Sequence, residues 1–248
     1  MHTKNKQSIT KAMNILLILT AALLPAVALL YYIWKKDTQK EPTYLLLKAV
    51  AWGIAISVPV SIVEGGLEYL LFGEDGKPTN LVGTTALAFV VAALTEESFK
   101  LWALWLVLRK NPYFDEHFDG IVYAVGVGLG FAAFENVMYV FGNDDWLSTA
   151  VLRAFLAVPG HYAFAILMGY YYSVYHFADH SPKVAVCVLL MPILAHGTYD
   201  AIAMSGMLNP YIEGISFFVL IYFCVKMHKV ARNKVLALVE KDNDRLKA

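Results

Sequence analysis

Residues 81–108, LVGTTALAFVVAALTEESFKLWALWLVL, form an apolar run that is interrupted near its middle by charged side chains. A helix needs about 20 mostly apolar residues to span the hydrocarbon core of a bilayer, so this run is long enough to cross it. Each ionisable side chain at that depth costs roughly 2.5–3.5 kcal/mol on insertion scales, which makes a functional role the first hypothesis. Glu96, Glu97 and Lys100 are therefore the first candidates for a functional site.

Six further apolar runs lie on either side of this one, separated by short polar connections. Hydrophobic residues make up 58% of the 248 residues, charged residues make up 16%, and the mean hydropathy is +0.54, as is typical of polytopic membrane proteins. Only helices and closed barrels satisfy backbone groups in lipid, and these runs are too long for barrel strands. The sequence predicts an all-α, polytopic transmembrane helix bundle with about seven spans, at residues 13–34, 44–72, 81–108, 120–141, 149–177, 183–207 and 211–226.

The connections carry no soluble domain, so residues 1–248 are predicted to form a single transmembrane domain. Lysine and arginine are concentrated in alternate connections and in the C-terminal tail, which predicts that the C-terminus is cytoplasmic. Three lysines before the first span favour the opposite side, so the orientation of the first helix stays open. Residues 227–248 are expected to form a basic amphipathic cytoplasmic tail on the anionic inner leaflet. The net charge of zero gives no indication of a nucleic-acid partner.

Four of the predicted helices carry acids or imidazoles closer to their middles than to their ends. If the helices form one bundle, these side chains can converge on one site inside the membrane. A single polar side chain in a span can be explained by helix packing, but acids and imidazoles at a similar depth in four helices are harder to explain in that way. The side chains are Glu96, Glu97 and Lys100 in the third span, Glu135 in the fourth, Arg153 and His161 in the fifth, and His196 and Asp200 in the sixth.

The spacing within two of these helices favours specific pairs. Glu96 and Lys100 are four residues apart with the acid first, the favourable order for an ion pair on one helical face. Glu97 is three residues from Lys100, so Lys100 can hold one carboxylate while the other stays free. His196 and Asp200 are also four residues apart, and Asp200 can orient the imidazole or serve as a fourth metal ligand. Arg153 is expected to pair with one of the buried acids.

Two histidines and one glutamate on separate helices make a suitable ligand set for zinc, with an open position for water. We therefore predict Glu135, His161 and His196 as ligands of Zn²⁺. An unliganded glutamate nearby, Glu96 or Glu97, would then act as general base on the water. The ligands are scattered over three helices with no HExxH, so their spacing alone is a moderate signal.

Other interpretations of the same residues stay open. The acid and imidazole chain suits a proton- or ion-coupled transporter, although the paired broken helices expected of one are not visible. A non-catalytic membrane scaffold and haem ligation by His161 and His196 are further alternatives. The EESFK stretch alone is also compatible with a structural ion pair, and His117 is expected to be solvated in a loop. Glu64 and Glu68 either line a water-filled entrance or snorkel to the interface.

The ordered motifs resemble those of the PrsW family of intramembrane metalloproteases, which is related to the type II CAAX prenyl proteases. EESFK matches EExxK, FAAFEN matches FxxxE at Glu135, PGHYAFAILMG matches the histidine motif at His161, and HGTYD matches HxxxD at His196 and Asp200. The resemblance covers residues 90–205, which we interpret as the catalytic core. One departure is Ala124, where a glycine is expected; this affects packing and not chemistry.

The resemblance implies an intramembrane, metal-dependent endopeptidase. It implies cleavage of membrane-anchored protein substrates, such as an anti-sigma factor, by a glutamate-activated water. The expected location is a bacterial cell membrane, with membrane lipids as further partners and no nucleic acid. In this interpretation Glu96, Glu97, Lys100 and Asp200 are catalytic, and Glu135, His161 and His196 bind the metal.

Overall fold

The computed structural model describes residues 2–74 and 77–247, but not the side chains of residues 2–12 and of residue 246. The described residues form helices and connections, with no strand among them. Seven helical segments are long and apolar enough to cross a membrane, which confirms the predicted fold class. They are Met13–Lys36, Thr43–Phe72, Leu81–Leu108, Asp119–Phe141, Trp146–Phe177, Pro182–Leu208 and Pro210–Arg245.

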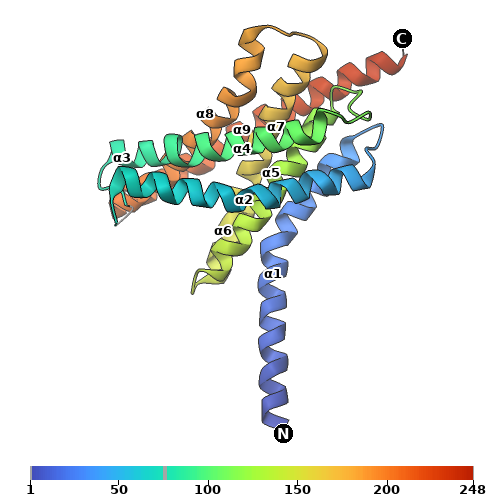
Figure 1. Ribbon diagram of the computed structural model, residues 1–248. Coiled ribbons are helices and arrows are strands. Elements are labelled where there is room, and N and C mark those ends of the chain that lie inside the picture. Colours follow the sequence, from blue (N-terminus) through green and yellow to red (C-terminus); the bar gives the residue numbers. More distant parts are fainter. Residues whose placement is uncertain (1, 75–76, 248) are drawn as a thin grey trace.

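Three of these segments contain more than one helical element, so the labels in Figure 1 run beyond seven. The elements are α1 (His2–Lys36), α2 (Thr43–Phe72), α3 (Leu81–Ala86), the π-helix η1 (Leu87–Ala93), α4 (Leu94–Leu108), α5 (Asp119–Phe141), α6 (Trp146–Phe155), α7 (Ala157–Phe177), α8 (Pro182–Ser205), the 3-10 turn η2 (Gly206–Leu208) and α9 (Pro210–Lys247).

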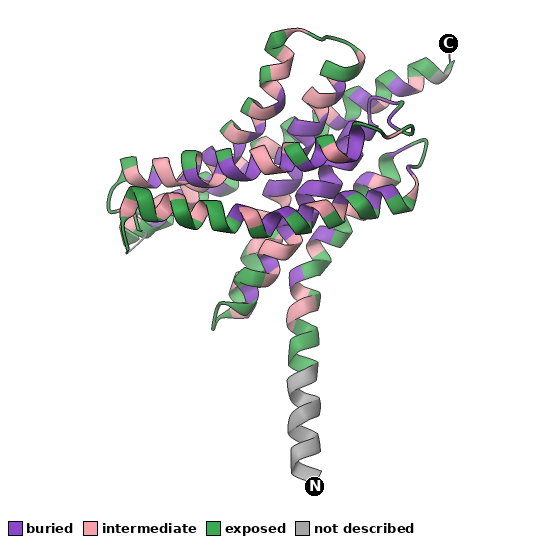
Figure 2. Cartoon of the chain, in the orientation of Figure 1, coloured by how far each residue is buried: buried purple, intermediate pink, exposed green. Residues whose placement is uncertain are grey.

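Helix α5 is the centre of the bundle. It packs against α1, α2, α4, α6 and α7. In its most apolar window 72% of the residues are buried, compared with 11% in α1. Figure 2 shows this difference as a buried central helix and largely exposed outer faces. Because apolar side chains on those outer faces are numerous, they suit contact with lipid tails rather than water.

Small residues allow α2 to approach α5 closely, and α5 carries glycines at positions 126, 128 and 130. A Cβ atom on Gly130 would overlap the backbone of Val50 in α2. A Cβ on Gly53 would similarly overlap the carbonyl oxygen of Val127 in α5. Gly128 faces α7 instead, where a Cβ would lie 2.7 Å from that of Ala165. The two helices that flank α5 therefore pack directly on its backbone.

This packing predicts that Gly130→Ala destabilises the protein by about 1–3 kcal/mol, the usual cost of overpacking a tight interface. Thermal unfolding of the purified protein in detergent measures the effect. Gly65→Ala on α2 is the matched control, because a Cβ there meets nothing within 4 Å. Alanine also has the higher helix propensity, so the control is expected to be unchanged or slightly more stable. Equal melting temperatures for the two variants would contradict the packing argument.

The fifth predicted span is broken at one residue, where the sequence analysis expected one helix. Helix α6 ends at Phe155 and α7 begins at Ala157, with Leu156 between them at φ −118° and ψ −63°. The cause is Pro159, which has no N–H to donate and whose ring collides with the carbonyl four residues earlier. The break places Arg153 and His161 on separate helices that converge on α5.

The C-terminal tail continues α9 and packs on the bundle. Ala231, Val235 and Leu238 are buried in the main hydrophobic core, with at most 5% of their surface exposed. The tail is helical, as expected, and this apolar face of it packs against protein. At its far end Asp242 accepts hydrogen bonds from the backbone N–H groups of His117 and Phe118.

His117 also donates through Nδ1 to Asp242, at 2.7 Å. The expectation that His117 is solvated was wrong: 5% of its surface is exposed. A partner 125 residues away in the chain explains why the loop sequence did not reveal this burial.

Candidate active site

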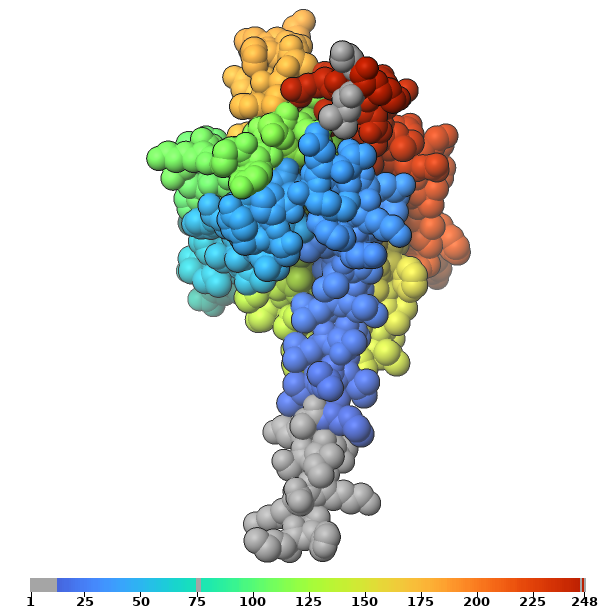
Figure 3. Space-filling model, turned by 90° about the vertical axis from the view of Figure 1, so that its right-hand side faces the viewer, coloured from blue at the N-terminus to red at the C-terminus, as the bar shows by residue number. Residues whose placement is uncertain are grey.

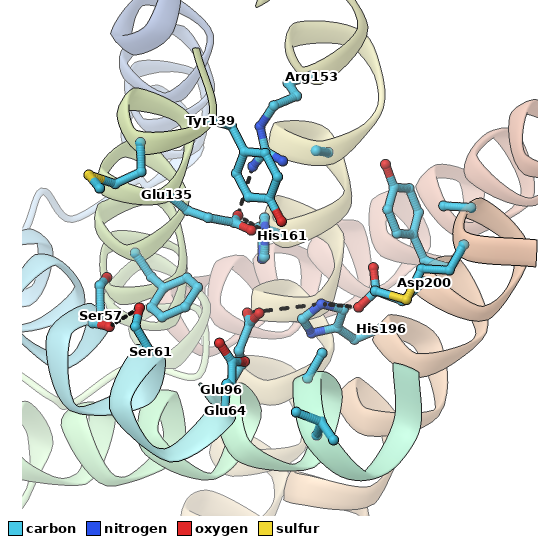
Figure 4. Close-up of a pocket in the computed structure, with 18 of the residues that line it drawn as sticks. Ser57, Ser61, Glu64, Glu96, Glu135, Tyr139, Arg153, His161, His196 and Asp200 are labelled. Carbon is cyan, nitrogen blue, oxygen red and sulfur yellow. Dashed lines mark hydrogen bonds and ion pairs between the residues drawn. The ribbon is translucent and has the colours of Figure 1, made fainter. Parts of the chain in front are cut away.

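Glu96, Glu97, His161 and His196 meet in the interior of the bundle. One ligand atom from each lies within 4.8 Å of the others, and all four residues are buried. The glutamates come from α4, His161 from α7 and His196 from α8. Figure 4 shows Glu96 and the two imidazoles turned toward one another across a common space. The structure therefore brings acids and imidazoles from three separate helices together at one site, as the sequence analysis predicted for a single bundle.

Lys100 lies within this cluster and bridges its two carboxylates. Its Nζ is 2.8 Å from Oε2 of Glu96 and 2.8 Å from Oε1 of Glu97. It is also 3.2 Å from Nδ1 of His161. The sequence predicted that Lys100 holds one carboxylate and leaves the other free; here it holds both. Oε2 of Glu97 is buried and has no hydrogen-bond partner among the described residues.

Each histidine has one ring nitrogen directed at a carboxylate outside this group. Nε2 of His161 donates to Oε2 of Glu135 at 2.9 Å. Nε2 of His196 is 3.2 Å from Oδ2 of Asp200, while its Nδ1 is 2.9 Å from Oε1 of Glu97. A carboxylate on the outer nitrogen fixes the tautomer and orientation of a metal-binding imidazole. Both Nδ1 atoms therefore contact residues of the cluster, and Nε2 of His196 also lies 3.9 Å from Oε2 of Glu96.

Glu135 is held by a second partner as well. Nη2 of Arg153 lies 2.8 Å from its Oε2, so Arg153 pairs with an acid of the predicted spans, as expected, although this carboxylate is only partly buried. Nε of Arg153 donates to Asn136, whose amide in turn donates to the carbonyl of Ala22 in α1. Glu135 thus lies beside His161, but it is not one of the four residues with mutually close ligand atoms.

A cavity of about 750 Å³ opens beside the cluster, within the range of ligand-binding clefts. Its walls come from α2, η1, α4, α5, α6, α7, α8 and η2, and apolar side chains such as Phe131, Phe134 and Met138 form much of its surface. Figure 4 shows Glu96, Glu135, His161 and His196 on this surface. Glu64 and Glu68 also line it, which supports the entrance alternative for these acids.

The π-helix is the feature of the site that sequence reasoning missed. Residues Leu87–Ala93 form it, and Glu96 and Glu97 follow in the first turn of α4. A π-helix adds residues to a turn and is frequent at functional sites, because it shifts the side chains that follow around the helix axis. The run LAFVVAA is uniformly apolar and carries no signal for this change of winding.

The donor set fits a metal ion. Two imidazoles and two carboxylates are ligands that zinc accepts, and structural and catalytic zinc sites use such nitrogen and oxygen atoms. Oε2 of Glu97, which has no partner in residues 2–74 and 77–247, is a buried acceptor that a cation would satisfy.

Fold and site together define a polytopic membrane protein with a buried glutamate–histidine cluster on the wall of an intramembrane cavity. A family model for the PrsW family intramembrane metalloproteases matches residues 41–227, and the chain belongs to this family. Curated relatives carry the name Protease PrsW. The protein from Clostridioides difficile is 35% identical over 74% of this chain and 77% of its own length. The protein from Oceanobacillus iheyensis is 34% identical over 82% of this chain and 86% of its own length. The protein from Bacillus subtilis is 31% identical over 87% of this chain and 96% of its own length. No solved structure matches the chain.

The family membership confirms the resemblance seen in the motifs. The protein is an intramembrane protease, a peptidase that acts on protein substrates, and an integral membrane protein of bacteria. The matched region contains all the motif residues from Glu96 to Asp200.

Proposed function

We propose that the protein hydrolyses a peptide bond of a membrane-anchored protein, using a zinc ion and a water activated by Glu96. The observation that carries this proposal is the convergence of two imidazoles and two carboxylates on the wall of a cavity inside the membrane. Residues 90–205 would then form the catalytic core, with residues 227–248 as a cytoplasmic tail.

His161, His196 and Glu97 are the proposed zinc ligands. The Nδ1 atoms of both histidines face the cluster, and Glu97 supplies a buried oxygen that has no partner in the described part of the chain. Glu135 and Asp200 would orient the two rings through their outer nitrogens. Glu135 as a direct ligand stays a prediction from the sequence, and the measurement below distinguishes the two roles.

When bound, zinc supplies a Lewis acid that polarises the scissile carbonyl and makes a water more acidic. Glu96 is the proposed general base because it lines the cavity, whereas Glu97 is fully buried behind it. Its carboxylate would accept the proton of the attacking water and later donate it to the leaving amine. Lys100 orients that carboxylate through its bond to Oε2. The rings of Phe131 and Phe164, which contact Lys100 and His196, exclude bulk water from these groups.

The cavity also supports a class of substrate. Its largely apolar walls suit the membrane-spanning or membrane-proximal part of a protein substrate, and an anti-sigma factor is one such protein. The lysines and arginines in alternate connections support a cytoplasmic C-terminus, by the positive-inside rule.

Metal analysis of purified variants tests the ligand set. The wild-type protein is expected to contain about one zinc ion per chain, and His196→Ala and Glu97→Gln are expected to lose it. Glu135→Gln is expected to weaken binding by about 10–100-fold, the effect of removing an orienting partner. Full zinc loss in Glu135→Gln with retention in Glu97→Gln would make Glu135 the ligand. Unchanged zinc in His196→Ala would remove His196 from the set.

A further inference from the structure

A second buried carboxylate cluster lies away from the active site, at one end of the bundle. It comprises Asp37 in the α1–α2 connection, Glu116 in the α4–α5 loop and Asp119 at the start of α5. In Figure 3 the blue, green and red segments that include these connections and the end of α9 come together at the top of the molecule. Asp119 precedes Glu135 by 16 positions on α5, or about 24 Å along the helix axis. The two clusters are therefore separate.

The three carboxylates are close together and shielded from solvent. One oxygen from each lies within 4.8 Å of the other two. Their exposed fractions are 3% for Asp37, 6% for Glu116 and 1% for Asp119. Like charges at such separations repel strongly away from water, so the arrangement is compensated either by bound protons or by a cation.

Hydrogen bonds in the cluster leave two oxygens unused. Oδ2 of Asp119 accepts from the backbone N–H groups of Asp115 and Glu116, at 3.0 and 2.7 Å. Glu116 accepts from the side-chain amide of Gln39 through Oε1. The other oxygens, Oδ1 of Asp119 and Oε2 of Glu116, are buried and have no partner among the described residues. Unpartnered buried acceptors of this kind indicate an absent ligand.

Protein cations do not provide the missing charge within the described part of the chain. None of the three carboxylates forms an ion pair there with lysine or arginine. The ammonium of Lys40 lies nearby, but it donates to the carbonyl oxygens of Trp34 and Asp37.

Further buried acids surround the cluster and increase its negative charge. Asp242 is bound to His117, and Glu41 accepts from the hydroxyl of Tyr123. Because these carboxylates are shielded from water, a bound cation would be more favourable here than on an open surface.

We propose that Asp37, Glu116 and Asp119 bind a hard divalent cation, Ca²⁺ or Mg²⁺, at a site distinct from the catalytic metal. Carboxylate oxygens are the ligands that these two ions prefer, whereas zinc favours nitrogen and sulfur. The ion would join the α1–α2 connection, the α4–α5 loop and the first turn of α5. Because the α4–α5 loop also binds Asp242, the ion would further stabilise the docking of the C-terminal helix.

Terbium luminescence on the purified full-length protein tests the site. Tb³⁺ binds calcium sites and emits when a nearby aromatic ring absorbs, and Tyr123 contacts Glu41 beside this cluster. The wild-type protein is expected to bind Tb³⁺ saturably, and Ca²⁺ or Mg²⁺ is expected to displace it. Glu116→Gln is expected to weaken binding by at least about tenfold, the loss that even an outer partner of a metal causes. Glutamine keeps an oxygen for the Gln39 contact while it removes the charge.

Two further variants locate the bound ion. Asp144→Asn, at an exposed acid in another loop, and His196→Ala, in the catalytic cluster, are both expected to bind Tb³⁺ like the wild type. Circular dichroism verifies the fold of each variant, and Asp37→Asn replaces Glu116→Gln if the latter does not fold. Absence of saturable binding to the wild type overturns the proposal. So does unchanged affinity in Glu116→Gln or Asp37→Asn, and so does a loss confined to His196→Ala.

Discussion

Glu96→Gln is expected to lower the rate of substrate cleavage by about 10²–10⁴-fold while the zinc content stays at the wild-type level. Glutamine has the size of glutamate and can still accept a hydrogen bond from Lys100, whose Nζ is 2.8 Å from Oε2 of Glu96. It cannot accept a proton from water. The variant therefore separates the base from the ligands, because Glu97→Gln is expected to lose both zinc and activity. Cleavage of a tagged membrane-anchored substrate in vesicles measures the rate.

Glu213→Gln on α9 is the matched control for this experiment. Glu213 is exposed and outside the cavity, so the same change of charge is expected to leave cleavage unaffected. Wild-type cleavage by Glu96→Gln would exclude Glu96 as the base. Zinc loss in Glu96→Gln together with zinc retention in Glu97→Gln would exchange the two proposed roles.

The spans and the convergence of the site could be predicted because the bilayer imposes strong local rules. Long apolar runs need no tertiary information to be identified as helices. A buried acid or imidazole is costly enough in lipid that Glu96, His161 and His196 had to find one another or another partner. Spacing within one helix also predicted contacts correctly: His196 and Asp200 are four residues apart in the sequence, and their side chains are in contact.

Features that depend on neighbouring helices could not be predicted in the same way. The π-helix before Glu96 arises in a uniformly apolar run, so no residue type marks it. His117 is buried because Asp242 reaches it from the far end of the chain. The choice between Glu97 and Glu135 beside the histidines depends on how α4, α5 and α7 are rotated, and spacing within any one helix does not define that rotation. The break at Leu156 does have a local cause in the sequence, which is Pro159.

Lys100→Met is expected to have the largest effect on stability, a loss of about 3–5 kcal/mol in the metal-free protein. This is the usual cost of leaving buried charges without their partner. The ammonium is 3% exposed and bridges two carboxylates that are themselves 6% and 0% exposed. Methionine fills a volume similar to that of lysine, so the loss of stability would come from removal of the positive charge and not from a cavity. Thermal unfolding in detergent after chelation measures it, with the exposed Lys183→Met as the control for charge removal.

Two additions make this result specific to the cluster. The double variant Lys100→Met/Glu96→Gln is expected to be more stable than Lys100→Met alone, because it removes one of the unpaired charges. Zinc is expected to recover part of the loss in Lys100→Met, since a cation held by Glu97, His161 and His196 supplies positive charge in place of the ammonium. If Lys100→Met unfolds at the same temperature as Lys183→Met, the carboxylates do not depend on Lys100 for charge balance. In that case the bridging contacts of Nζ in the metal-free cluster would not describe the working enzyme, and the roles of Glu96 and Glu97 would have to be assigned from the zinc-bound protein.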